Sequence, residues 1–163
     1  MLLYPKLYCQ KVTDIKVEYL KENNIKALIL DVDNTLLDFD LNIVDGLKAW
    51  HDEIKANNIK CIILSNSNKE EKVKMVANLL DIQFIKFATK PLKRGFKKAK
   101  EALGEKAENI AVVGDQIFTD VIGANRCKMH PILVKPVAEK DLWMTRFKRP
   151  LENLIIKKYL KSR

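Results

Sequence analysis

Short apolar runs recur along the chain, separated by longer segments that are richer in polar residues. Each run is rich in Ile, Val or Leu and does not alternate strictly with polar residues. Runs of this kind are typical of strands that are covered on both faces, as in a parallel sheet. The pattern predicts five strands, at residues 26–32, 60–66, 84–90, 109–115 and 131–137.

Apolar residues recur at helical spacing in the segments between these runs. The first three connections show this spacing at Val44, Leu47, Trp50 and Ile54, at Val73, Val76 and Leu80, and at Phe96, Ala99 and Leu103. Ser67 and Glu70 form a capping-box pattern before the second helix, and Gly104 is placed to end the third. A shorter helix is expected near residues 117–127. This alternation predicts an α/β fold, a three-layer doubly wound parallel sheet with right-handed crossovers.

The length and composition suit one globular domain over residues 1–163. The three cysteines are far apart and form no CxxC pair, so we expect neither a disulfide framework nor a zinc site, and a reducing cytoplasm is the default. No run approaches the roughly 20 apolar residues of a spanning helix, which favours a soluble protein. The net charge of +9 favours polyanionic partners such as anionic membrane, nucleic acid or phosphorylated substrates.

Polar and charged side chains follow the first four predicted strands. They are Asp31 and Asp33, then Ser65 and Asn66, then Lys90, then Asp115 and Asp120. The carboxyl ends of parallel strands meet at one edge of the sheet, where ligands bind, so we expect these side chains to form one pocket. Clustered carboxylates without a nearby His or Cys suit a hard cation. Mg²⁺ fits best, because it is held by a few carboxylates together with phosphate oxygens of the substrate.

These groups divide into distinct roles in phosphoryl transfer. Asp31, at the end of the strand, is the better nucleophile for an aspartyl-phosphate intermediate. Asp33, in the following loop, is the better acid/base for the leaving alkoxide and the attacking water. Ser65 and Lys90 are placed to hold the oxygens of the phosphoryl group. A single Asp after a strand is more often a cap or turn residue, but complementary groups at four strand ends indicate a catalytic site.

The ordered motifs resemble those of the haloacid dehalogenase-like (HAD) phosphohydrolase superfamily. The likeness lies in "DVDNT" at 31–35, Ser65 of "LSNSN", Lys90 of "TKP" and "GDQIFTD" at 114–120. It implies that Asp31 is both nucleophile and Mg²⁺ ligand, and that Asp33 is the acid/base and binds the metal through its backbone carbonyl. It further implies that Asp115 is the third metal ligand, that Ser65, Asn66 and Lys90 bind the phosphoryl group, and that Thr35 and Asp120 support the site.

The spacing of the motifs leaves no room for the cap domain of larger superfamily members. Only 31 residues separate Asp33 from Ser65, and 24 separate Ser65 from Lys90. Each gap suffices for a turn and one helix. The site is therefore expected to be open, which suits a bulky substrate or one presented by a membrane or macromolecule. Alternatively, a second subunit of a homo-oligomer supplies the lid.

Within this capless subclass III group, the sequence resembles the bacterial YqeG-type and mitochondrial phosphatidylglycerophosphate phosphatases. The likeness is greatest in "GDQIFTDVIGAN" at 114–125, and includes an N-terminal extension of about residues 1–25. It implies hydrolysis of phosphatidylglycerophosphate to phosphatidylglycerol. A small soluble sugar, nucleotide or cofactor phosphate suits the same open site. A rival hypothesis, a basic nucleic-acid or ribosome-binding module on this fold, is disfavoured by the complete acidic set.

The C-terminal segment, about residues 139–163, is basic and carries apolar residues at helical spacing. Pro150 is expected in the first turn of a helix there. One hypothesis is that this segment lies on an anionic membrane, which would place the protein in the cytoplasm, peripheral on the inner face of the membrane. The other is that its apolar stripe packs on the sheet and its lysines face solvent.

Overall fold

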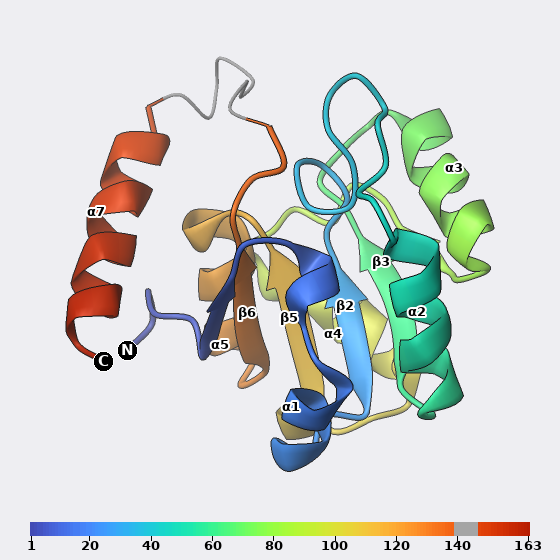
Figure 1. The fold of residues 1–163 in the computed structure, drawn as a ribbon, viewed down its shortest axis with the longest axis horizontal. Coiled ribbons are helices and arrows are strands. Elements are labelled where there is room, and N and C mark those ends of the chain that lie inside the picture. Colours follow the sequence, from blue (N-terminus) through green and yellow to red (C-terminus); the bar gives the residue numbers. More distant parts are fainter. Residues whose placement is uncertain (139–146) are drawn as a thin grey trace.

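A parallel sheet of six strands forms the centre of the computed structural model, which describes residues 1–138 and 147–163 (Figure 1). The strand order is β1-β6-β5-β2-β3-β4, and every neighbouring pair is parallel. The strands are β1 (Leu7–Cys9), β2 (Ala27–Leu30), β3 (Lys60–Leu64), β4 (Phe84–Ile85), β5 (Ile110–Gly114) and β6 (His130–Val134). The five strands predicted from the apolar runs are confirmed, with shorter bounds.

Helices cover both faces of this sheet. The α-helices are α1 (Val17–Glu22), α2 (Leu47–Ala56), α3 (Glu70–Leu80), α4 (Lys93–Leu103), α5 (Ile122–Arg126) and α7 (Arg149–Lys161). Short turns of other helix types are η1 (Val12–Asp14), η2 (Ala107–Asn109) and the π-helix η3 (Ile117–Val121). The short fourth helix that the sequence predicts is thus a π-helical turn that continues into α5.

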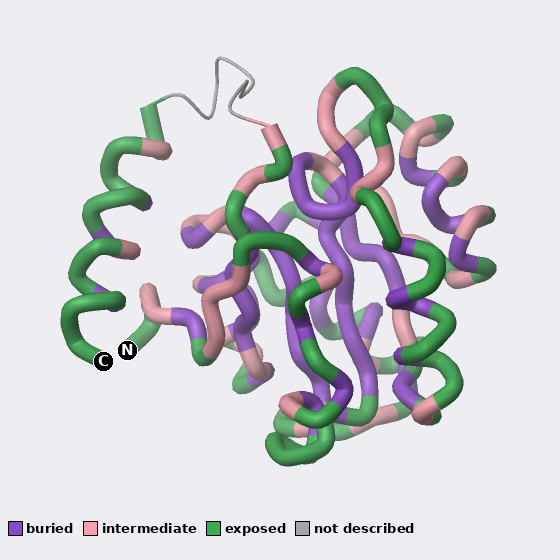
Figure 2. The backbone as a smooth tube through the Cα atoms, viewed as in Figure 1, coloured by how far each residue is buried: buried purple, intermediate pink, exposed green. Residues whose placement is uncertain are grey.

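The two cores lie on opposite faces of the central strands, which are buried along their length (Figure 2). Leu28 and Leu30 of β2 point to the core under α1, α2 and α3. Ala27 and Ile29, which alternate with them, point to the core under α4 and α5. Because both faces of a parallel sheet are covered, its strands read as continuous apolar runs. The three-layer architecture expected from the sequence is confirmed.

Two local features differ from the sequence-based expectation. The predicted capping box of α3 is wrong: the helix begins at Glu70 with Lys69 at its N-cap. The Ser67 hydroxyl instead accepts a hydrogen bond from the Lys69 N–H, and Glu70 pairs with Lys74 and Lys86. Strand β1 was not predicted, because it has only three half-buried residues at the edge of the sheet. Gly104 ends α4 with φ of 65°, as expected.

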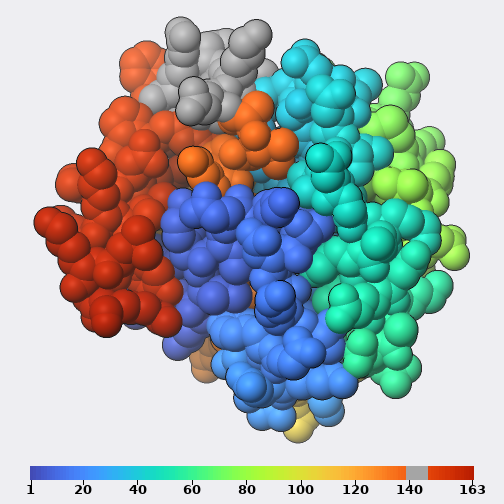
Figure 3. Space-filling model, viewed as in Figure 1, coloured from blue at the N-terminus to red at the C-terminus, as the bar shows by residue number. Residues whose placement is uncertain are grey.

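The C-terminal helix α7 packs against β6, η3 and the N-terminal segment. Pro150 lies in its first turn, as predicted, and Ile155 and Tyr159 are its buried apolar residues. The Tyr159 ring contacts that of Tyr4 edge-on, with 5.6 Å between centroids, and Figure 3 shows the N-terminal segment lying against α7. One face of the helix therefore packs on the body, as one of the two hypotheses expected. The predicted tail residues 139–146 lie outside the described residues.

No helix in the described ranges, 1–138 and 147–163, combines the length and the apolar character needed to cross a membrane.

The contact between α4 and α5 generates a stability prediction. Gly123 lies against the fully buried Phe96 ring, and a Cβ atom at this position would overlap that ring. Because the ring is fully buried, we expect Gly123→Ala to destabilise the protein by about 1 to 3 kcal/mol, measured by urea unfolding. The cost should shrink in a Phe96→Leu background, where the ring is absent. An unchanged urea midpoint in Gly123→Ala would contradict this packing.

Candidate active site

The candidate site lies where the path of the chain through the sheet reverses. From β2 the chain continues outward to β3 and β4, whereas β5 and β6 lie on the other side of β2. Ligands bind beyond the carboxyl ends of the strands at such a switch point. Asp31 directly follows β2, and Asp115 directly follows its neighbour β5. The topology therefore places these two carboxylates side by side.

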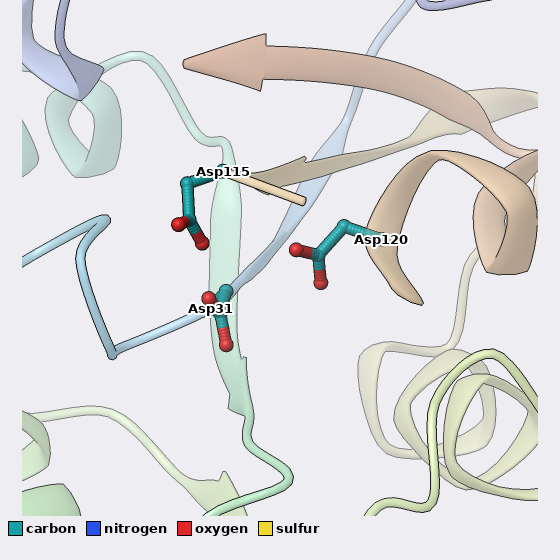
Figure 4. Close-up of side chains that lie close together, drawn as sticks. All are labelled: Asp31, Asp115 and Asp120. Atoms are coloured by element: carbon teal, nitrogen blue, oxygen red, sulfur yellow. The ribbon is translucent and has the colours of Figure 1, made fainter. Parts of the chain in front are cut away.

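Three buried carboxylates converge at this edge of the sheet. Asp31, Asp115 and Asp120 each offer an oxygen, and the three oxygens lie within 4.8 Å of one another. Figure 4 shows the three side chains directed toward a common centre, with Asp120 projecting from η3. Burial raises the pKa of Asp31 and raises that of Asp115 well above its ordinary value, with the Asp31 charge adding to the effect at Asp115.

This donor set fits a divalent metal ion. All three groups are oxygen donors close enough to share one ion, and hard cations such as Mg²⁺ prefer carboxylate oxygens. Asp31 and Asp115 are two of the metal ligands that the motif resemblance implies. Asp120, for which the resemblance implies a supporting role, belongs to the same group of three carboxylates.

Lys90 is the buried cation of this cluster. Its Nζ donates hydrogen bonds to Asp31 Oδ1 at 2.8 Å and to Asp120 Oδ1 at 2.7 Å. Burial lowers the pKa of Lys90, but the carboxylates of Asp120 and Asp31 raise it more, so the net shift is upward. Lys90 is therefore charged at neutral pH and offsets part of the repulsion among the carboxylates.

Asn66 connects Lys90 to the loop after β3. Its side-chain amide accepts a hydrogen bond from the Lys90 N–H at 2.8 Å and donates one to the Lys90 carbonyl at 3.1 Å. Ser65, which is fully buried, accepts a hydrogen bond from the Ser67 N–H through Oγ. The motif resemblance implies that the side chains of Ser65 and Asn66 bind a phosphoryl group. In the structure, the Asn66 side chain positions the backbone of Lys90.

The loop from Asp31 to Thr35 turns back beside the carboxylates. Asn34 has a left-handed conformation with φ of 57°, which Asn tolerates better than most residues. The Thr35 hydroxyl lies 3.3 Å from Asp31 Oδ2 and 3.4 Å from Asp115 Oδ1. The hydroxyl therefore connects the loop after β2 with the loop after β5.

Asp33 differs in environment from the other three aspartates. Its side chain is about a quarter exposed (27%) and forms an ion pair with Lys72 of α3. It lines a cavity of about 530 Å³ at the carboxyl edge of the sheet, together with Asn66, Asp115 and the cations Lys69, Lys72, Lys148 and Arg149. Phe39 and Phe87 add an apolar part to the lining. The cavity thus joins the acidic cluster to a basic and partly apolar opening.

Arg149, at the first position of α7, is a site residue that the sequence reasoning missed. Its Nη2 donates to Asp115 Oδ2 at 2.6 Å, and its Nη1 donates to the Asp115 carbonyl at 2.9 Å and to Glu152 Oε2 at 3.1 Å. The buried Glu152 also accepts a hydrogen bond from the Phe118 N–H in η3. The sequence contains one signal for this role of Arg149. Glu152, the one acidic residue in 147–163, follows Arg149 by three positions.

The burial of Lys90 between two carboxylates predicts a large cost for its removal. We expect Lys90→Met to destabilise the metal-free protein by about 3 to 5 kcal/mol, because breaking a buried ion pair leaves unpaired buried charge. Urea unfolding in EDTA measures this cost. Lys48→Met, which removes an exposed pair with Asp52, is the matched control and should cost less than about 1 kcal/mol. Equal effects of the two variants would show that the cluster does not depend on Lys90.

Comparison with known proteins identifies the family. The profile described as "Mitochondrial PGP phosphatase" matches residues 1–138. The probable phosphatase YqeG of Bacillus subtilis (strain 168) is 42% identical over 153 residues, which cover 93% of this chain and 88% of that protein. The chloroplastic/mitochondrial phosphatidylglycerophosphate phosphatase 1 of Arabidopsis thaliana is 24% identical over 168 residues. That match covers 97% of this chain and 48% of the plant protein.

Solved structures agree with the fold. The cobalt-bound deoxy-D-mannose-octulosonate 8-phosphate phosphatase of Haemophilus influenzae superposes with a TM-score of 0.58 at 18% identity, covering 87% of this chain and 93% of that chain. The sequence motifs, the fold and the family match thus agree with one another. The chain belongs to the mitochondrial PGP phosphatase family and is a phosphatase, a phosphoric monoester hydrolase.

Proposed function

We propose that this phosphatase is Mg²⁺-dependent, acts through an aspartyl-phosphate on Asp31, and hydrolyses phosphatidylglycerophosphate to phosphatidylglycerol. The observation that supports the chemistry most strongly is the convergence of Asp31, Asp115 and Asp120 on one centre with Lys90 bound between two of them. The name of the matched family and that of the plant relative support the substrate.

In the proposed first step, a carboxylate oxygen of Asp31 forms a bond to the substrate phosphorus while the bond to the leaving alkoxide breaks. Lys90, which already contacts Asp31, supplies positive charge beside the transferred group. Ser65 and Asn66 belong to the phosphate-binding loop of this proposal. Asp33 donates the proton that the departing alkoxide takes up, so an alcohol is released.

In the proposed second step, water attacks the phosphorus of the aspartyl-phosphate. Asp33, now deprotonated, accepts a proton from this water, and the products are inorganic phosphate and the Asp31 carboxylate. The exposure of Asp33 to the cavity is consistent with contact to both a leaving group and water. Asp31 and Asp115, with the Asp33 backbone carbonyl, would hold Mg²⁺, and Asp120 would support them. The ion would supply charge stabilisation for the phosphoryl oxygens.

The reaction type is tested with p-nitrophenyl phosphate. We expect hydrolysis in MgCl₂, loss of activity in EDTA, and a kcat lowered by at least about 10³-fold in Asp31→Asn, because that variant lacks the nucleophile. Asp52→Asn, an exposed change of the same chemistry, should keep wild-type activity. Full activity of Asp31→Asn would contradict the aspartyl-phosphate. Salt-dependent RNA binding by a protein without phosphatase activity would instead support the nucleic-acid-binding hypothesis.

The surroundings of the cavity support a substrate at a membrane surface. Lys69, Lys148 and the half-exposed Phe87 line the cavity, and Phe147, which is 83% exposed, directly precedes Lys148. Leu151 and Leu154 are half exposed on the following turns of α7. Basic and apolar side chains together favour binding to anionic lipid. We therefore propose that these basic and apolar side chains around the cavity contact an anionic membrane while the substrate headgroup enters the cavity.

The substrate proposal is tested with lipid vesicles. We expect kcat/KM for phosphatidylglycerophosphate in anionic vesicles to exceed that for glycerol 3-phosphate by at least about tenfold, and vesicle binding to weaken in high salt because surface charge is screened. The double variant Phe147→Ser, Leu151→Ser should bind vesicles several-fold more weakly but hydrolyse p-nitrophenyl phosphate normally. Leu160→Ser, at the other end of α7, is the matched control. Equal kcat/KM values for lipid and soluble substrates would contradict the proposal.

A further inference from the structure

The contact between Arg149 and Asp115 joins the C-terminal helix to the acidic cluster. The 2.6 Å distance from Nη2 to Oδ2 is that of a strong charge-assisted hydrogen bond. The other carboxylate oxygen, Oδ1, has the Thr35 hydroxyl 3.4 Å away. Both oxygens of Asp115 thus face a donor, and Arg149 is the charged one.

Each carboxylate of the cluster has a cationic partner within the chain. Lys90 pairs with Asp31 and Asp120, and Arg149 pairs with Asp115. A divalent ion held by Asp115 would share this carboxylate with the guanidinium, and two cations on one carboxylate repel one another. We propose that Arg149 is a tethered counter-ion of Asp115 that competes with the divalent metal for this carboxylate. This inference rests on the proposed metal site.

The remaining contacts of Arg149 explain why it would stay beside the site after displacement. Nη1 is bound to the Asp115 carbonyl and to Glu152, two acceptors that a metal at the carboxylates leaves in place. Glu152 is itself fixed to η3 through the Phe118 N–H. The guanidinium can therefore release Oδ2 without detachment of α7. Arg149 thus acts as a positioning residue that sets how strongly the cluster attracts a cation.

Direct metal binding without substrate tests this role, with Mn²⁺ as the probe, followed by its electron paramagnetic resonance signal. Arg149→Gln removes the competing charge, so we expect its Kd for Mn²⁺ to be about tenfold lower than that of the wild type. Lys158→Gln, an exposed residue of the same helix, makes the same change in net charge and should leave the Kd unchanged. If Arg149 only held Asp115 in place, its loss would instead weaken Mn²⁺ binding.

A wild-type or weaker affinity in Arg149→Gln would overturn the inference while leaving the proposed metal site intact. Absence of Mn²⁺ binding by the wild type, or equal binding by Asp115→Asn, would overturn the metal site and this inference together. Should Arg149→Gln fail to fold, Arg149→Met tests the same point, because methionine also removes the charge while keeping a long side chain. Its Kd is likewise expected to be about tenfold lower than that of the wild type, and an unchanged Kd would overturn the inference.

Discussion

The site depends on one electrostatic balance: three carboxylates are buried together, and cations from distant parts of the chain lie against them. Burying charge without a partner costs several kcal/mol, so the sheet edge is stable only if these cations are held in place. Lys90 is held by Asn66, which fixes its backbone from the neighbouring loop. Arg149 is held by Glu152 and the Asp115 carbonyl. The loops and the C-terminal helix are thereby coupled to the same three side chains.

The proposed chemistry follows from the different surroundings of the aspartates. Asp31 is buried and accepts a hydrogen bond from Lys90. This pairing suits a nucleophile, because the lysine offsets part of the negative charge of Asp31 as it approaches the phosphorus. Asp33 is two residues further on, partly exposed, and paired with a lysine of α3 at the cavity. A group that exchanges protons with a leaving group and with water needs that access. Two carboxylates from one short loop can therefore serve different steps because the fold buries one and exposes the other.

Much of this arrangement could be predicted from the sequence, because it depends on local patterns of apolar residues and on the topology of parallel sheets. The strands that are buried on both faces read as apolar runs, and the rule for parallel sheets brings Asp31, Lys90 and Asp115 to one edge. Signals in the sequence are weaker for the features that depend on tertiary packing. Strand β1 is too short and too exposed to have a clear pattern. The contact of Arg149 with Asp115 spans 34 positions and depends on the docking of α7, in which Ile155 packs with residues of η3 and Tyr159 contacts Tyr4.

The modest docking of α7 has a consequence for how the fold opens. Within the described chain, the helix buries Glu152, Ile155 and Tyr159, whereas the central strands are buried along their whole length. Elements with few buried contacts detach at a lower free energy than the core, in local rather than global unfolding. Detachment of α7 would remove Arg149 from the cluster while leaving the sheet intact. Arg149 therefore belongs to a cooperative unit that is less stable than the central strands, which position Asp31 and Asp115.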